Sequence, residues 1–120
     1  MKLIPPFLAG LVVALYGSFA SAAGPLLEDG RVDTQEDSPV DIFPDLYVIS
    51  AETDLDFSSI AIVEQPLGGV AWVDDAWGVL VYEPAPAFYG YVALSYTIRD
   101  VNGEESTVGW IYLHVEPYGE

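Results

Sequence analysis

The stretch that decides the fold is YEPAPAFYGYVALSYTIRD, residues 82–100, and an Asn-Gly pair follows it closely. From Val92 to Arg99, large apolar residues alternate with small or polar ones. Pro84 ends the preceding apolar run, and Asp100 with the Asn-Gly pair supplies turn residues at the other end. Alternation with a period of two, bounded by turn residues, predicts a half-buried antiparallel β-strand.

Outward from this stretch, the sequence predicts short strands throughout and no helix, because no segment sustains a helical hydrophobic period. The seven expected strands are residues 32–34, 40–48, 58–64, 70–73, 79–82, 92–99 and 107–115. Seven short strands separated by turn residues are typical of an immunoglobulin-like β-sandwich. We therefore expect an all-β, seven-stranded sandwich over residues 31–118, preceded by a short flexible leader at 23–30.

Alternation along the strands also assigns side chains to the core or to the surface. The side chains expected to point inward are Val40, Ile42, Ile60, Ile62, Ala71, Val73, Leu80, Tyr82, Leu94, Tyr96, Ile98, Ile111, Leu113 and Val115. The side chains expected to point outward are Trp72, Val79, Val81, Trp110, Tyr112 and His114. A pairing register shifted by one residue would invert these faces.

Several short motifs follow one another along the chain. They are Glu36-Asp37-Ser38-Pro39, Gly69-Val70, Gly78-Val79-Leu80, Tyr82-Glu83-Pro84, Phe88-Tyr89-Gly90, the strand at 94–100, Asn102-Gly103 and Ser106-Thr107-Val108. In this order and spacing, the chain resembles a single copy of the bacterial cadherin-like domains of the immunoglobulin-like superfamily, which occur in tandem-repeat surface proteins. The resemblance implies the same sandwich fold and a role in surface interaction, and it identifies no ligand.

The first 22 residues predict a secretory signal peptide. Lys2 supplies a positive start, residues 7–20 form an apolar run, and Ala20-Ser21-Ala22 is a small-residue cleavage site. The apolar run is shorter than the ~20 residues of a membrane-spanning helix. We therefore expect a secreted or periplasmic protein of the cell envelope, with no stable membrane span after the signal is cleaved.

The charge balance excludes several partners. Without residues 1–22, Arg31 and Arg99 stand against nineteen acidic residues, which is a net charge of −17, and the chain has no cysteine. Such a charge disfavours nucleic acid and anionic lipid, and it suits a salt-adapted surface, a cation or a basic partner. The lack of cysteine excludes disulfides and thiol chemistry.

Oxygen-bearing side chains gather in two loops that the sandwich connectivity places at one pole. Asp54 and Asp56 lie in one loop, and Asp100 and Asn102 lie in the other. Calcium is bound by carboxylate, carbonyl and water oxygens. In the cadherin-like domains that the chain resembles, acids in such loops help to hold calcium between neighbouring domains. These four residues are therefore a candidate Ca²⁺ site, and calcium is the one cofactor that the sequence suggests.

The outward apolar residues are the other candidate site. Trp72, Val79 and Val81 are expected on one sheet with Trp77 at the hairpin tip, and Trp110 and Tyr112 on the other. Aromatic residues are enriched at protein interfaces, so we expect these residues to bind a protein partner or a second copy of the chain. An alternative is that the leader folds over the Trp72 side.

We expect no catalytic residue. The only histidine, His114, lies in a strand, and no serine stands in a nucleophile motif. The function expected from the sequence is a non-enzymatic interaction or adhesion module that calcium could stabilise. Two alternatives stay open: a carbohydrate-binding module, because flat aromatic rings stack on sugars, and a small hydrolase that uses paired carboxylates.

Overall fold

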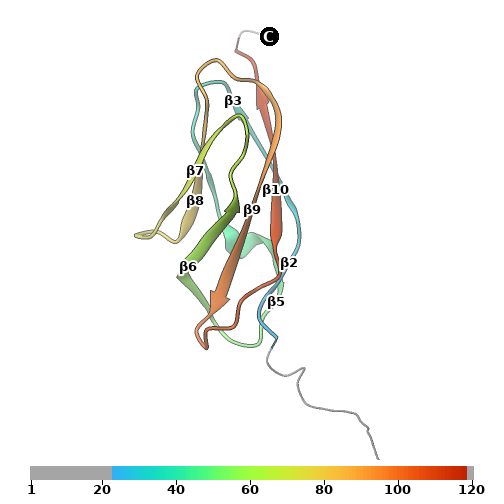
Figure 1. The fold of residues 1–120 in the computed structure, drawn as a ribbon, viewed down its shortest axis with the longest axis vertical. Coiled ribbons are helices and arrows are strands. Elements are labelled where there is room, and N and C mark those ends of the chain that lie inside the picture. The colour runs from blue at the N-terminus through green and yellow to red at the C-terminus, as the bar shows by residue number, and fades with distance from the viewer. Residues whose placement is uncertain (1–22, 119–120) are drawn as a thin grey trace, which may run out of the picture.

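The structure is a computed structural model that describes residues 23–118 (Figure 1). The predicted signal peptide, residues 1–22, lies outside the described residues. The elements in chain order are β2 (Leu26–Leu27), β3 (Gly30–Gln35), β4 (Val40–Ile42), the 3₁₀ turn η2 (Pro44–Tyr47), β5 (Val48–Ser50), β6 (Leu55–Glu64), β7 (Gly69–Asp74), β8 (Val79–Pro84), β9 (Gly90–Asp100) and β10 (Gly109–Glu116).

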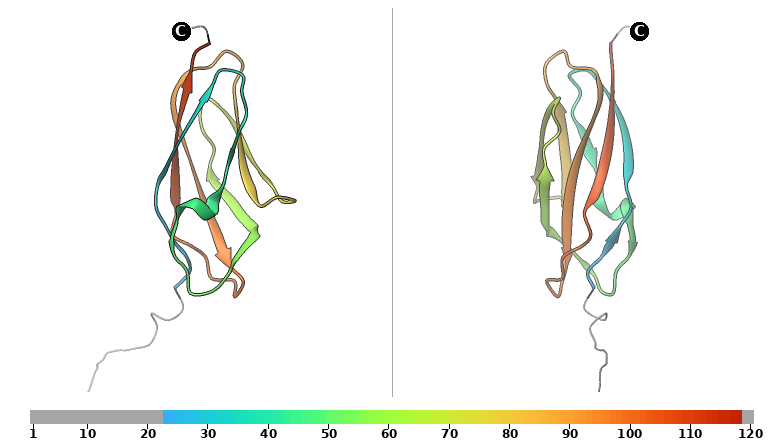
Figure 2. Two further views of the ribbon diagram at one scale, coloured as in Figure 1. Left: turned by 180° about the vertical axis from the view of Figure 1, so that it is seen from behind. Right: turned by 45° about the vertical axis from the view of Figure 1, so that its right-hand side comes forward.

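Two sheets pack as an elongated sandwich (Figure 2). One sheet has four strands in the order β3-β10-β9-β6, and the other has three in the order β4-β8-β7. β2 and β5 form a separate two-stranded sheet. β3 pairs with β10 in parallel, whereas the remaining pairs are antiparallel. The described chain begins at one end of the sandwich and finishes at the opposite end (Figure 1). The expected all-β immunoglobulin-like sandwich is confirmed.

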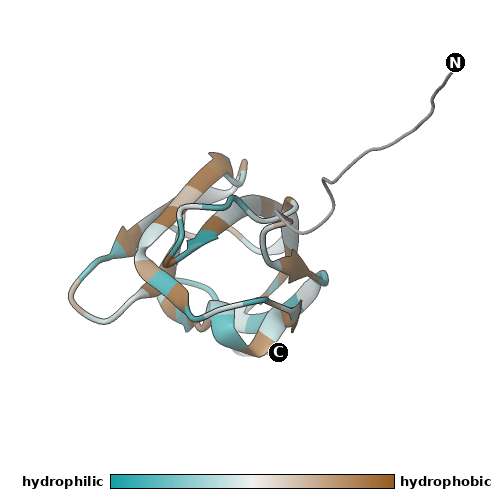
Figure 3. Ribbon diagram, turned by 90° about the horizontal axis from the view of Figure 1, so that it is seen from below, coloured by the Kyte–Doolittle hydropathy of each residue, from teal (hydrophilic) through white to brown (hydrophobic). Residues whose placement is uncertain are grey.

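The core has the composition that alternation predicts. All the side chains expected to point inward either belong to the buried hydrophobic cluster or pack against it. Seen along the long axis, the strands form two facing layers, and hydrophobic residues occur on both (Figure 3). Tyr82 is fully buried, and its hydroxyl donates a hydrogen bond to the carbonyl oxygen of Gly68 at 2.9 Å. The period-two pattern therefore assigned the core faces in the correct register.

The single strand expected at 40–48 is wrong. The segment divides into β4, the 3₁₀ turn η2 and β5. Pro44 stands at the start of η2, where its missing N–H and fixed φ are compatible with a helical turn but not with a central strand. The break lets the chain change partners, since β4 pairs with β8 while β5 pairs with β2.

The boundary expected at residue 31 also differs from the structure. Residues 26–27 pair with β5, and Leu27 is buried in the core cluster. The Leu27 N–H donates to Thr107 Oγ1 at 3.0 Å, and the Thr107 N–H donates to the Pro25 carbonyl at 3.1 Å. The segment expected to be a flexible leader is therefore part of the sandwich. Burial of the Leu27 side chain stabilises this arrangement by ~1.5–3 kcal/mol of transfer free energy.

Candidate functional site

The outer face of the three-stranded sheet is apolar. Trp72 on β7 lies opposite Val81 on β8, which in turn lies opposite Asp41 on β4. Val79 and Val81 alternate along β8 with core residues, so their outward direction agrees with the sequence prediction. Their expected exposure does not, because they are only 7% and 8% exposed. Larger side chains flank them on this face.

These larger neighbours are themselves exposed. Phe43, Val70, Trp72 and Trp77 are exposed apolar side chains. Phe43 and Trp77 line a groove of about 350 Å³ together with Val79 and two acidic residues, Asp41 and Asp74. We call this surface the Trp72 face. Its members are Phe43, Val70, Trp72, Trp77, Val79 and Val81. Sequence reasoning missed Phe43 and Val70, although the alternation of Val70 with the core residue Ala71 was a usable signal.

A rigid turn presents Trp77. The carbonyl oxygen of Asp74 accepts hydrogen bonds from the N–H groups of Trp77 and Gly78, and Asp74 Oδ1 accepts one from the Ala76 N–H at 3.1 Å. Gly78 has φ +67°, a conformation that glycine adopts without steric cost. Trp77 is 80% exposed at this tip, and the hairpin projects sideways from the sandwich (Figure 1).

The N-terminal segment does not cover the Trp72 face. β2 pairs with β5, and both lie on the side of the sandwich away from the β7–β8 hairpin (Figures 1 and 2). The alternative that residues 23–30 fold over these tryptophans is therefore wrong.

The outer face of the four-stranded sheet carries the other predicted aromatics. Tyr112 is exposed, whereas Trp110 is half-buried beside Ser95, its neighbour on β9. Tyr112 lines a groove of about 520 Å³, which we call the Tyr112 groove. The other side chains used below that line it are Arg31, Tyr91, Ala93 and His114.

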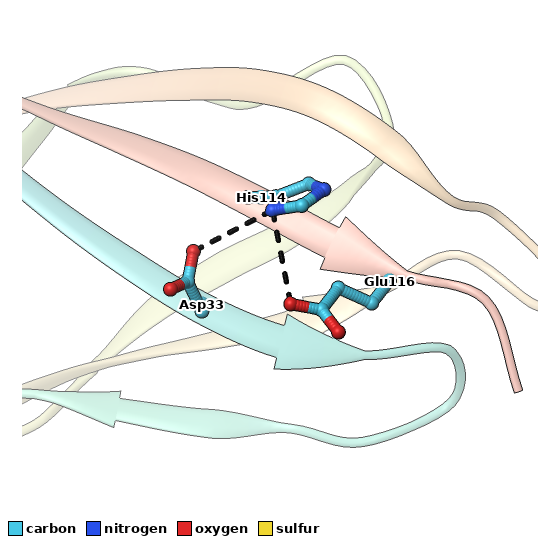
Figure 4. A network of polar contacts seen from close by, with 3 residues as sticks. All are labelled: Asp33, His114 and Glu116. Carbon is cyan, nitrogen blue, oxygen red and sulfur yellow. Dashed lines mark ion pairs between the residues drawn. The ribbon is translucent and has the colours of Figure 1, made fainter. Parts of the chain in front are cut away.

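His114 lies at the centre of a polar cluster beside this groove (Figure 4). Its Nδ1 lies 3.6 Å from Asp33 Oδ1 and 3.9 Å from Glu116 Oε2. Its ring stacks on that of Tyr91, with centroids 4.3 Å apart and an interplanar angle of 6°. His114 faces outward as expected, and it forms a stacked aromatic pair with Tyr91 on the surface.

The four candidate calcium ligands take part in hydrogen bonds within and between their loops. Asp100 Oδ1 accepts hydrogen bonds from the N–H groups of Asn102 and Glu104, both at 2.9 Å. Asp56 Oδ1 accepts one from the Ser58 N–H at 3.0 Å. The two loops do meet, since the Val101 N–H donates to the Asp54 carbonyl oxygen at 2.9 Å.

The structure does not bring these carboxylates together as a metal centre. Within residues 23–118, no three His, Cys, Asp or Glu side chains are grouped so that they could hold a metal ion. The candidate Ca²⁺ site at Asp54, Asp56, Asp100 and Asn102 therefore stays a prediction from the sequence. Asp100 instead organises the turn after β9, because its carboxylate accepts two backbone N–H groups.

No helix in the described range is long and apolar enough to cross a membrane.

Comparisons with known proteins agree with the fold. A family model described as "Bacterial Ig domain" matches residues 23–110. No curated protein matches the sequence. Among solved structures, the PKD domain from the KIAA 1837 protein has 13% sequence identity and a TM-score of 0.50, and the similarity covers 87% of this chain and 96% of that one.

Two further solved structures are similar at lower scores. The PKD domain (329–428) of human KIAA0319 has 15% identity and a TM-score of 0.44, with coverage of 87% of this chain and 93% of that one. CopC from Methylosinus trichosporium OB3b has 11% identity and a TM-score of 0.42, with coverage of 77% and 87%.

Proposed function

The chain belongs to the bacterial Ig domain family, and we propose that it is a non-enzymatic interaction module of the cell envelope that binds a protein partner through the Trp72 face. We propose further that residues 1–22 are removed on export, which gives a secreted or periplasmic domain. The observation that carries the proposal is a contiguous apolar surface bearing two exposed tryptophans, uncovered by the N-terminal segment.

The geometry of the Trp72 face supports a role in binding a partner. Scattered apolar side chains are normal on protein surfaces, whereas a contiguous patch with tryptophan marks an interaction site. Trp77 is held on a hydrogen-bonded turn, so it loses less conformational freedom on binding than a tryptophan on a loose loop would. Rigid aromatic anchors of this kind supply most of the binding energy in many interfaces.

Charge indicates the character of the partner. Asp41, Asp74 and Glu83 border the Trp72 face, and the chain without residues 1–22 has a net charge of −17. Two copies of the domain would repel each other, whereas a basic rim on the partner would be attracted. We therefore propose a partner whose surface is apolar at the centre and basic at the rim. Calcium has no part in this proposal.

The test is affinity for a partner captured on immobilised domain from the native envelope fraction and then purified. We expect Trp72→Ser and Trp77→Ser each to weaken binding at least about tenfold, which corresponds to about 1.4 kcal/mol. Tyr89→Ser is the matched control, because Tyr89 is an exposed aromatic outside the Trp72 face. Binding should also weaken with added salt.

Equal affinity of the domain and of all three variants would place the interface elsewhere and refute the proposal. Sedimentation of the domain alone tests whether the Trp72 face instead joins two copies of the domain. If it dimerises, and Trp72→Ser abolishes the dimer, the Trp72 face joins two copies and not a basic partner.

A further inference from the structure

The Tyr112 groove lies on the sheet opposite the Trp72 face and has a different chemistry. From its geometry we infer that it binds a neutral sugar chain. The inference does not depend on the proposed protein partner, because the two surfaces belong to different sheets.

Strand pairing builds the groove from two adjacent rows of side chains. In one row, Tyr112 lies between Arg31 on β3 and Ala93 on β9. In the next row, His114 occupies the middle position and Tyr91 lies on β9. The small side chain of Ala93 leaves a gap between the two tyrosines, which are diagonal neighbours across the strands. The groove of about 520 Å³ therefore has aromatic walls and a floor at Ala93.

The aromatic walls are preorganised. Tyr91 is 73% exposed, yet its ring is held parallel to the His114 ring at 4.3 Å. Asp33 Oδ1 and Glu116 Oε2 lie 3.6 and 3.9 Å from Nδ1 of His114 (Figure 4). A ring fixed in advance loses little entropy on binding. Flat ring faces such as these suit the C–H face of a pyranose, which is apolar and similar in size.

The polar groups suit sugar hydroxyls. Within the described part of the chain, Arg31 has no carboxylate oxygen within 4.0 Å and no hydrogen-bond partner for its side chain. By contrast, the Nη1 of Arg99, the other arginine, donates to the Gly103 carbonyl at 2.8 Å. Arg31 thus offers free donors on one side of the groove, while Asp33 and Glu116 offer acceptors near His114. Hydroxyl groups both donate and accept, so they can use both sides.

Charge decides between neutral and acidic sugars. Asp33 and Glu116 stand close to the groove, and the chain without residues 1–22 has a net charge of −17. One arginine does not offset this repulsion for a polymer of uronic acids. A neutral pyranose chain avoids the repulsion and keeps the stacking and the hydrogen bonds.

The test uses the full-length chain, expressed and purified, and titrated with neutral hexaoses of glucose, mannose, xylose and galactose. A hexaose of galacturonic acid is the acidic comparison. We expect at least one neutral hexaose to bind saturably with a Kd below about 10 mM, and the acidic one to bind more weakly. Two-dimensional amide spectra of the unmodified protein should place the shifts around Tyr91, Ala93 and Tyr112.

Variants then assign the binding to the groove. Tyr112→Ala and Tyr91→Ala should each weaken binding at least about tenfold, and Ala93→Gln should weaken it by filling the floor. Trp72→Ser is the matched control and should bind the sugar as the unmodified protein does. The inference is overturned if no neutral hexaose saturates, if the acidic hexaose binds best, or if the shifts fall outside the groove. Because the shifts are measured on the unmodified protein, a variant that fails to fold does not prevent a decision.

Discussion

Replacing Asp100 tests whether this residue is a ligand for calcium or a support for the turn after β9. The side chain is 2% exposed, and its Oδ1 accepts the N–H groups of Asn102 and Glu104 at 2.9 Å. The backbone of the same turn is closed by the Gly103 N–H, which donates to the Asp100 carbonyl at 2.9 Å. Asp100→Ala would leave both side-chain-bound N–H groups without this acceptor.

The expected loss follows from these two bonds. A hydrogen bond to a charged group contributes ~1.5–3 kcal/mol, and water can replace part of it at a loop. We therefore expect Asp100→Ala to lower the free energy of unfolding by about 2–3 kcal/mol. For a domain of this size, that corresponds to a fall in Tm of roughly 8–24 °C. Asp100→Asn keeps an oxygen at the same position, so it should cost less than about 1 kcal/mol.

The assay is thermal unfolding followed by circular dichroism, in calcium chloride and in sodium chloride at matched ionic strength. We expect the two salts to give the same Tm for the unmodified protein, because both act by screening the negative charge. A rise in Tm specific to calcium that Asp100→Asn abolishes would refute the reasoning and restore the metal site. Equal losses for the alanine and asparagine variants would also refute it, since the accepted N–H bonds would then not be the cause.

Further predictions concern Tyr96, Tyr82 and Leu27 in the core and Gln65 at the sheet edge. Tyr96→Phe should raise the free energy of unfolding by about 1 kcal/mol at pH 7, because the buried Tyr96 hydroxyl has no hydrogen-bond partner within the described residues. Tyr82→Phe should lower it by a similar amount, because the bond to the Gly68 carbonyl is lost. Burial raises the pKa of Tyr96 to about 12, with smaller contributions from Tyr47 and Asp29. The stability that comes from keeping this hydroxyl protonated is therefore fully present below pH ~10 and is lost as the pH rises toward ~12. Tyr96→Phe should remove this part of the alkaline loss of stability, measured by urea unfolding across that pH range. Leu27→Ala should cost ~2–5 kcal/mol by denaturant unfolding, and a cost near zero would show that residues 23–30 are a leader after all. Gln65→Ala should lower the free energy of unfolding by about 1–2 kcal/mol and increase aggregation measured by light scattering below the Tm. The reason is that the Gln65 amide closes the free edge of β7 through two 2.8 Å bonds to the backbone of Ala71.

The amino-acid sequence alone determined the fold class and every member of the buried core cluster except Leu27. Alternation is a local property of a strand, since successive side chains point to opposite faces whatever the strand pairs with. Leu94, Tyr96 and Ile98 therefore could be assigned to the core without knowing their partners, and all three are fully buried. The same pattern correctly gave the outward direction of Trp72 and Tyr112.

Only the tertiary structure decided which outward residues are accessible and which polar groups meet. Val79 and Val81 are buried, in a strand that lies between β4 and β7. Arg31 lies beside Tyr112 because β3 pairs with β10 in this register. Asp100 changes from a candidate ligand to a turn support once the backbone of its loop is known. The physical reason is that exposure, hydrogen bonding and charge contacts depend on residues distant in sequence, whereas the period of a strand is encoded in consecutive residues.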